Sequence, residues 1–172
     1  MTHQSFRPVV FSVFFLFLTP TSLLAQHKAP DLKFKTYHNV QYGFSLNYPS
    51  ALLQQIKGTN IADGIQLRSK NHKVKADIWG SHQGGTISQS YVSSIKSLPN
   101  TENIYFSQLK DNVYIVIGSN NKDLFFRMTT YQKEGSVNFQ MRYPIDEAKL
   151  WMPVLQLMAQ SLQPLPGSIK QV

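Results

Sequence analysis

Regular alternation of apolar and polar residues most strongly limits the folds open to this chain. In residues 44–48 the apolar side chains stand at every second position, which is the period of a strand with one buried face. Residues 64–68 and 74–78 alternate in the same way and would form a hairpin across a turn at Asn71-His72. Four further strand-like runs follow, at residues 104–109, 113–118, 124–131 and 137–143. Their connections are short enough for antiparallel hairpins, so the pattern predicts an antiparallel sheet.

Two helices are predicted to accompany these strands. Thr86-Ile-Ser-Gln89 matches the capping box, in which the threonine hydroxyl and the glutamine side chain each accept a hydrogen bond from the other residue's backbone N–H. Apolar residues at helical spacing follow until Pro99, which ends the run. The apolar stripe of the second helix consists of Trp151, Leu155, Met158 and Leu162. Strands combined with packing helices indicate an α+β fold with a central antiparallel sheet flanked by helices.

Three finer expectations concern the arrangement of these elements. Residues 113–117 are apolar on both faces, which is typical of a central strand covered on both sides of the sheet. Pro153 suits the first turn of a helix, so we expect residues 146–151 to form a separate turn or a kink. Residues 50–56 are expected to form a short helix closed by Gly58.

The first residues have the layout of a cleavable export signal. Arg7 precedes an apolar stretch at residues 9–18, and a polar segment then leads to Ala25. A membrane-spanning helix needs about 20 apolar residues, so this stretch is too short for an anchor. We therefore predict a signal peptide at residues 1–25, cleaved near Ala25, and a mature protein in the periplasm of a Gram-negative bacterium, with secretion as the alternative. No later run reaches spanning length, so no transmembrane segment is expected in the mature chain.

The chain of 172 residues contains no cysteine, which excludes thiol nucleophiles, thiolate zinc sites and Fe–S clusters. Because disulfides are excluded as well, an exported domain of this kind must be stabilised by its hydrophobic core. The length that remains after the signal peptide suits one domain. We predict a flexible lead-in at residues 26–36, a single domain at residues 37–163 and a C-terminal tail at residues 164–172.

Several short sequences in this chain resemble those of one protein family. They are Tyr42-Gly-Phe-Ser-Leu-Asn-Tyr-Pro49 with the preceding Tyr37-His-Asn, Asp63-Gly-Ile-Gln-Leu67 and Met141-Arg-Tyr-Pro144. In this outline the chain is similar to PsbP-like proteins, which include the extrinsic PsbP subunit of photosystem II, a Ran-binding nuclear-import factor and small exported proteins of Gram-negative bacteria. The resemblance implies an α/β/α sandwich around an antiparallel sheet and a non-catalytic accessory or binding role. It carries no site residue over, because the family's ion-binding and docking residues have no counterpart motif here.

No catalytic arrangement is expected from the residues. Ser45 lies in Gly-Phe-Ser-Leu-Asn, but a nucleophile elbow requires glycine where Asn47 stands. Asp77 and His82 have the residue types of a Ser-His-Asp triad, but nothing in their spacing predicts that they lie close to Ser45. The histidines likewise lack the spacing of a metal site. We therefore predict no catalytic residues, no metal site, no cofactor and no enzymatic activity, and keep an unrecognised hydrolase as the second alternative function.

A basic hairpin is the most marked surface feature of the sequence. The residues that we predict to bind anionic surfaces are Arg68, Lys70, Lys73, Lys75 and Trp79. Cations beside an exposed indole can bind phosphates or lipid headgroups, and the net charge of +8 favours anionic partners. The other interpretation is an edge hairpin whose lysines prevent strand-to-strand aggregation, with Trp79 under a helix.

These observations together predict an exported, non-catalytic accessory or binding protein that contacts an unknown protein or envelope component. The first alternative is an envelope-associated protein that binds anions or lipid headgroups through the basic hairpin. Nucleic acid is not an expected partner, given the predicted compartment.

Overall fold

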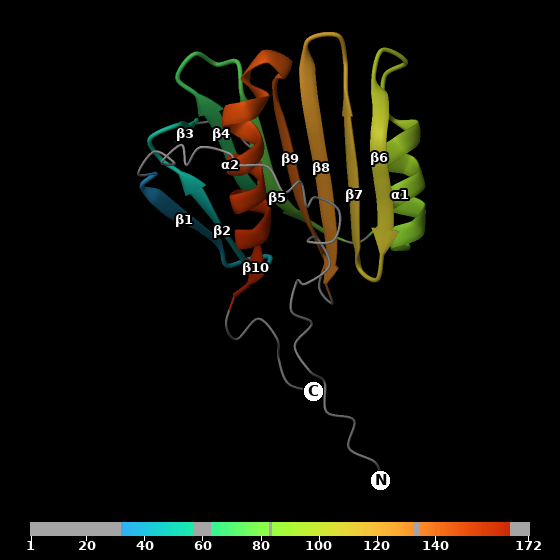
Figure 1. The fold of residues 1–172 in the computed structure, drawn as a ribbon. Helices are drawn as coiled ribbons and strands as arrows, with labels where there is room; N and C mark the ends of the chain where they lie inside the picture. Colours follow the sequence, from blue (N-terminus) through green and yellow to red (C-terminus); the bar gives the residue numbers. More distant parts are fainter. Residues whose placement is uncertain (1–31, 57–62, 83, 133–134, 166–172) are drawn as a thin grey trace, which may run out of the picture. The chain divides into compact units, whose positions relative to one another are not determined.

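The computed structural model describes residues 32–56, 63–82, 84–132 and 135–165, and Figure 1 shows their secondary structure. These residues belong to one structural unit, Leu32–Val172. The predicted signal peptide, Gly58 and most of the predicted lead-in and tail lie outside the described residues. The elements in chain order are β1 (Phe34–Asn39), β2 (Phe44–Pro49), β3 (Leu53–Gln55), β4 (Gly64–Ser69), β5 (Lys75–Ser81), α1 (Ile87–Lys96), β6 (Asn103–Lys110), β7 (Val113–Ser119), β8 (Asp123–Gln132), β9 (Gly135–Pro144), the 3-10 helix η1 (Ile145–Glu147), α2 (Ala148–Ser161) and β10 (Gln163–Pro164).

The strands of the described residues form two antiparallel sheets. The larger sheet has seven strands in the order β3-β4-β5-β9-β8-β7-β6, and the smaller has the order β1-β2-β10. Every one of these predicted strands forms, and most of them bury an apolar side. β6 is the exception, because all of its residues except Leu109 are exposed. The prediction that residues 113–117 form the central strand is wrong: they belong to β7, which is second from the edge, and β9 lies in the middle. β7 is apolar on both faces because a hydrophobic cluster lies on each side of it.

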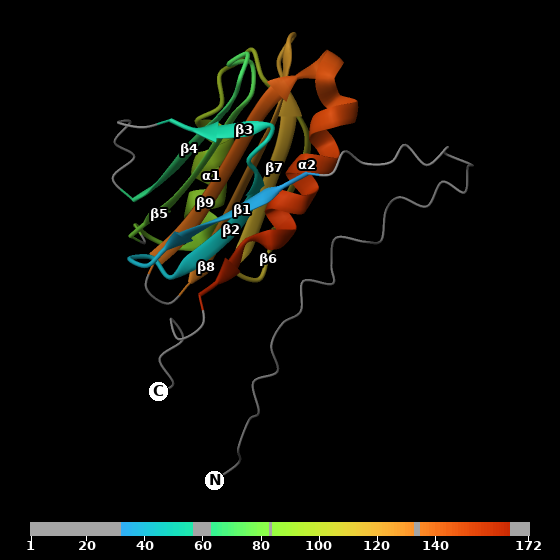
Figure 2. The same ribbon diagram turned by 90° about the vertical axis from the view of Figure 1, so that its left-hand side faces the viewer.

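One face of the large sheet forms the main hydrophobic core together with α2. On this face the side chains of Ile78, Phe139 and Met141 are almost fully buried. α2 packs on β9 and on β2 of the small sheet, and its buried side chains include Trp151 and Met158. Figure 2 shows α2 beside the small sheet. The predicted apolar stripe of the second helix therefore faces this core.

α1 packs on the other face of the large sheet. In β8, Phe125 belongs to the cluster that packs against α1, whereas the next residue, Phe126, belongs to the core with α2. Because successive side chains of a strand point to opposite faces, the two helices lie on opposite sides of the sheet. The predicted capping box is confirmed: the backbone N–H of Gln89 donates to Thr86 Oγ1 at 3.2 Å, and that of Thr86 donates to Gln89 Oε1 at 2.9 Å.

The fold is thus mixed α+β, with a large antiparallel sheet and two helices, and helix cover on the α1 face is partial. α1 packs on β7 and β8 at one end of that face. Further along, the strands β4, β5 and β9 present a polar face, made of Gln66, Arg68, Lys75, Asp77, Trp79, Asn138, Gln140 and Arg142. Within the described part of the chain, no helix is long and apolar enough to cross a membrane.

Four local predictions are wrong, and the first three fail because of long-range packing or strand pairing. Residues 50–56 contain β3 rather than a helix, since Leu53 is fully buried and pairs with β4. β1 begins at Phe34, inside the predicted flexible lead-in, because it pairs with β2. β2 itself is buried on both faces rather than one, since α2 also packs on it. α2 begins at Ala148 and holds Pro153 in its interior, so the predicted separate turn is confined to η1.

Candidate functional site on the polar face

Three cations occupy one row of the polar face. Arg68 of β4 lies directly opposite Lys75 of β5, and Lys75 lies directly opposite Arg142 of β9. Side chains at such positions share a face, and their Cβ atoms are about 4.5–5.5 Å apart. The β4–β5 hairpin and the β5–β9 pairing therefore assemble a basic row from Arg68, Lys75 and Arg142.

Carboxylates balance the two ends of the basic row but not its centre. Arg68 Nη1 donates to Asp77 Oδ1 at 2.6 Å. Arg142 forms an ion pair with Glu102, whose side chain is only 5% exposed. Lys75 lies between them, is exposed, and has no ion pair with any of the described residues. The centre of the row therefore keeps an uncompensated positive charge.

Arg127 of β8 adds a fourth cation beside the row. Its guanidinium lies over the Phe125 ring, 5.8 Å from the centroid, and the Arg142 guanidinium lies 5.5 Å from the same centroid. Arg127 Nη1 donates to the carbonyl oxygen of Ser94 in α1 at 3.5 Å. Unlike Arg68 and Arg142, Arg127 has no carboxylate partner within the described part of the chain. Because Arg127 is half-buried, an anion would stabilise a charge that water solvates only in part.

A groove opens between α1 and the sheet. Its volume is about 850 Å³, and side chains of α1, β5, β8 and β9 line it. We call it the α1 groove, and the lining residues used to describe it are Trp79, Ser90, Ser94, Arg127, Asn138 and Gln140. A second hollow, of about 210 Å³, contains Lys75 and Arg142 and shares Arg127 and Gln140 with the α1 groove. Arg127 therefore lies where the two hollows meet.

A chain of hydrogen bonds fixes the floor of the α1 groove. Thr129 Oγ1 donates to Asn138 Oδ1 at 2.9 Å, and Asn138 Nδ2 donates to Ser81 Oγ at 3.0 Å. Ser81 Oγ and Ser136 Oγ form a further hydrogen bond of 2.8 Å. The bonds cross three neighbouring strands, so the polar side chains of the floor are held in one arrangement.

Trp79 lines the same groove and is half-buried. Gly64 lies directly opposite it on β4. A methyl group added at Gly64 would lie 2.6 Å from Trp79 Cβ and 2.1 Å from the carbonyl oxygen of Ile78. Both contacts are too short, so a larger residue would displace the strand or the indole. A strand glycine of this kind permits a close approach that helps to position Trp79.

Comparison with solved structures identifies the fold. The solution structure of cyanobacterial PsbP (CyanoP) from Synechocystis sp. PCC 6803 matches with a TM-score of 0.59 and 12% identity, over 83% of this chain and 98% of that chain. The fold is PsbP-like. Two crystal structures match less well. One is of a protein from Bacteroides thetaiotaomicron VPI-5482, with a TM-score of 0.47 and 10% identity, over 80% of this chain and 50% of that chain. The other is of LpqN, involved in cell envelope biogenesis of Mycobacterium tuberculosis, with a TM-score of 0.40 and 12% identity, over 81% of this chain and 88% of that chain. No protein-family model and no curated protein matches the sequence.

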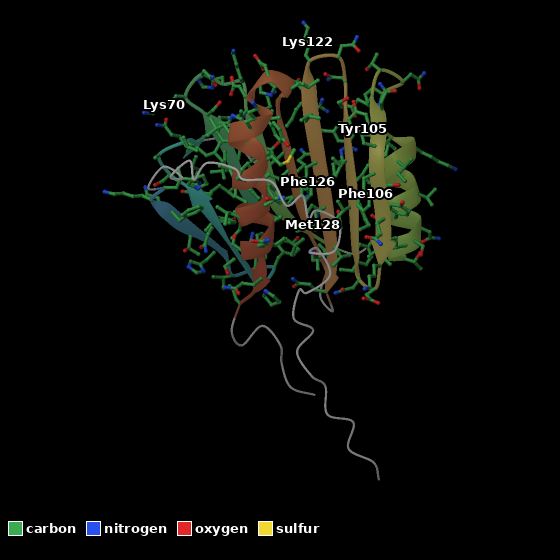
Figure 3. All side chains as sticks on the ribbon, in the orientation of Figure 1. Lys70, Tyr105, Phe106, Lys122, Phe126 and Met128 are labelled. Atoms are coloured by element: carbon green, nitrogen blue, oxygen red, sulfur yellow. The ribbon has the colours of Figure 1, made fainter. Side chains whose placement is uncertain are left out.

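The five residues that the sequence predicts to bind anions lie on different surfaces of the structure. Arg68, Lys75 and Trp79 lie on the polar face. Lys70 lies in the turn between β4 and β5, and Figure 3 shows its side chain extending away from the sheet. Lys73 Nζ lies 3.8 Å from a carboxylate oxygen of η1. The five residues therefore do not form one continuous site.

Sequence reasoning missed Arg127 and Arg142. Arg142 stands at a polar position of the clearly alternating strand β9, whereas the sequence of β8 around Arg127 does not alternate regularly. What the sequence did not show was that β9 pairs with β5. The hydrogen bond from Gln140 to Asp77, at 3.3 Å, joins residues 63 positions apart and records this long-range pairing.

Ser45, Asp77 and His82 are placed in three different environments. Ser45 is buried on β2, and the Asp77 carboxylate is bonded to Arg68. His82 is exposed, and its ring centroid lies 5.6 Å from that of Tyr42. The structure does not bring these residues together as a catalytic triad.

Proposed function

We propose that this protein is a non-catalytic accessory or binding protein whose polar face binds an anionic partner. One observation carries the proposal: Arg127 lies half-buried where two hollows meet, with no carboxylate partner among the described residues. Arg68 and Arg142 on the same face each have such a partner. A carboxylate or phosphate group of a bound molecule would give Arg127 the same charge-assisted hydrogen bonds.

The basic row supports the same proposal. Lys75 is exposed between Arg68 and Arg142, and like charges on neighbouring strands raise the positive potential of the surface around them. An anionic partner would therefore meet Lys75 as well as Arg127. Lys70 and Lys73 lie away from this face, so the lipid-headgroup alternative, which used the whole hairpin, has less support.

The non-catalytic part of the proposal is supported by the separate positions of Ser45, Asp77 and His82. The PsbP-like fold does not decide the activity by itself. Assays of the purified protein with generic esterase, phosphatase and glycosidase substrates test it directly. Turnover that copurifies with the protein and disappears on mutation of a groove residue would establish an enzyme instead.

Export remains part of the proposal and is supported by the sequence of residues 1–25. We propose cleavage near Ala25 and a periplasmic mature protein, with secretion as the alternative. Expression of the full chain in a Gram-negative host, followed by fractionation and mass determination of the amino terminus, tests this. A protein that keeps residues 1–25 in the cytoplasmic fraction would overturn it.

The anion-binding surface can be tested with two double variants of equal charge. Lys75→Gln/Arg127→Gln removes two cations from the polar face, whereas Lys35→Gln/Lys110→Gln removes two exposed cations from β1 and β6. Both are applied to a heparin column and eluted with a salt gradient. We expect the first variant to elute at clearly lower salt than the second, because only it loses the binding surface. Elution of both at the same salt concentration would refute the proposed surface.

A further inference from the structure

We propose that the ligand of the α1 groove is an acidic saccharide, with its sugar rings along the groove and a carboxylate on Arg127. This inference rests on the proposed function, which it extends from an anionic partner to a ligand class. Two features of the groove carry it: the hydroxyl and amide character of its walls, and the single half-buried cation at its end.

Both walls of the groove are lined by groups that donate and accept hydrogen bonds. The polar lining residues include Ser90, Ser93, Ser94 and Ser97 from the α1 side and Ser81, Thr129, Ser136, Asn138 and Gln140 from the sheet. Hydroxyl and amide side chains offer both donors and acceptors, as sugar hydroxyls do. An acyl chain would leave these groups without partners, which is unfavourable in a closed contact. The lining therefore favours a polyhydroxylated ligand over a lipid tail.

The orientation of α1 presents its serines to the groove. Ile87, Tyr91 and Ile95 pack toward the sheet, while Ser90 and Ser94, four positions apart, line the hollow. Residues at this spacing lie on the same side of a helix. Ser90 Oγ also lies 3.3 Å from the hydroxyl of Tyr114, so one side of the groove is tied to β7.

The opposite side of the groove is preorganised for a ring. The hydrogen bonds from Thr129 through Asn138 to Ser81 hold the polar floor, and Trp79 adds a half-buried aromatic surface. An indole presents a large rigid apolar face with one polar N–H, which suits a ring that is apolar on one face and hydroxylated at its edge. Groups fixed before binding lose less entropy when the ligand arrives. The volume of about 850 Å³ lies in the usual range of ligand pockets, about 300–1,000 Å³.

Arg127 and Lys75 determine where the carboxylates of the ligand bind. The Arg127 guanidinium can hold a carboxylate through two parallel N–H···O hydrogen bonds. Lys75 lies in the second hollow, which shares Arg127 and Gln140 with the α1 groove. A saccharide with repeated carboxylates can thus run from the groove past Arg127 to Lys75. This arrangement predicts that binding improves with each uronic acid added until Lys75 is reached.

Isothermal titration calorimetry of the full soluble domain with defined oligosaccharides tests the inference. The probes are oligomers of glucuronic acid, glucose oligomers of the same length, inorganic tripolyphosphate, and phosphatidylglycerol vesicles. We expect the glucuronic acid oligomers to bind at least tenfold more tightly than the neutral oligomers. Arg127→Gln should weaken the acidic oligomers about tenfold or more and leave binding of the neutral ones unchanged. Arg127→Lys keeps the charge but not the paired hydrogen bonds, so its affinity for the acidic oligomers should lie between that of the parent protein and that of Arg127→Gln.

Two controls keep the outcomes separable. Lys35→Gln removes one exposed cation elsewhere and should leave all affinities unchanged, and the thermal melting temperature of each variant shows that it is folded. Tripolyphosphate or vesicles that bind through Arg127, with glucuronic acid oligomers no better than neutral ones, would overturn the saccharide inference but keep an anion site. If none of the four probes responds to Arg127→Gln, the anion site itself is refuted. Neutral oligomers bound as tightly as acidic ones would also overturn the inference.

Discussion

Lys75 of β5 and Arg142 of β9 are direct partners across an antiparallel pair of strands, although both are cationic. Like charges at such positions destabilise a sheet by about 0.2–1 kcal/mol. Arg68 lies opposite Lys75 on its other side, so the lysine has a cationic neighbour on both strands. A sheet optimised for stability alone would carry a carboxylate or a neutral residue at this position. Retaining repulsion on one face is what we expect of a surface that serves binding.

Replacing Lys75 by glutamine should therefore stabilise the fold while weakening polyanion binding. We expect the free energy of unfolding to rise by about 0.2–1 kcal/mol, because the repulsion from Arg68 and Arg142 disappears. Urea denaturation followed by circular dichroism measures the change. Lys35→Gln is the matched control, since Lys35 lies opposite Tyr48 and has no cation across from it. A Lys75→Gln variant that is less stable than the parent would show that Lys75 has a stabilising contact instead.

Removing the Asp77 carboxylate should have the opposite effect on stability. The Arg68 and Asp77 side chains are 15% and 13% exposed, and their ion pair measures 2.6 Å. Asp77→Ala leaves Arg68 without its partner in a poorly solvated position, so we expect a loss of roughly 2–4 kcal/mol in the free energy of unfolding. The double variant Arg68→Met/Asp77→Leu should lose less than the single one, because no lone charge remains. Chemical denaturation of both decides this, and a double variant that loses more than Asp77→Ala would contradict it.

Two glycine substitutions should differ sharply although they add the same methyl group. At Gly64 the added carbon meets the backbone of Ile78 and the side chain of Trp79, so Gly64→Ala should destabilise the fold by about 1–3 kcal/mol. At Gly84 nothing lies within 4 Å of the added carbon, so Gly84→Ala should be neutral or stabilise by up to about 1 kcal/mol. Thermal melting compares the two variants with the parent. Equal melting temperatures would mean that β4 adjusts without strain.

The stability of the fold should fall at alkaline pH partly because of Tyr143. Burial raises the pKa of the Tyr143 phenol above its ordinary value of 10.0. Above pH 10 the unfolded chain loses this proton while the folded chain keeps it, so the contribution to stability is present below the unfolded pKa and declines as the pH rises. Tyr143→Phe should flatten this part of the decline. Urea midpoints measured at steps between pH 9 and 11.5 test it, and identical slopes for both proteins would count against it.

Local signals in the sequence were sufficient for most of the individual elements, but not for β1 and β3. The capping box at Thr86 and Gln89 involves residues of one helical turn, so nothing distant can change it. The alternation around Phe139 and Met141 predicted a strand because every second residue must reach the core. In contrast, the short segment with Leu53 has the composition of a helix and forms β3 because β4 offers an unpaired edge.

The candidate site was predictable only in part for the same reason. Lys75 and Trp79 lie on one strand, so their common face followed from a two-residue period. Arg142 and Arg127 join them through pairings between β5, β9 and β8, and no sequence pattern states the order of strands in a sheet. The contact of Lys73 with Glu147 could not be predicted either, because it depends on where η1 packs.

The shallow attachment of α1 has a consequence for how the molecule moves. Of the residues Ile87–Lys96, all of which the structure describes, none is fully buried. Elements with few buried side chains open locally at a lower free energy than the whole domain. The amide protons of α1 should therefore exchange with solvent well before those of β8 and β9. Because α1 forms one wall of the α1 groove, that wall would separate from the sheet more readily than the strands separate from one another. A molecule bound between α1 and the sheet would hold the groove closed.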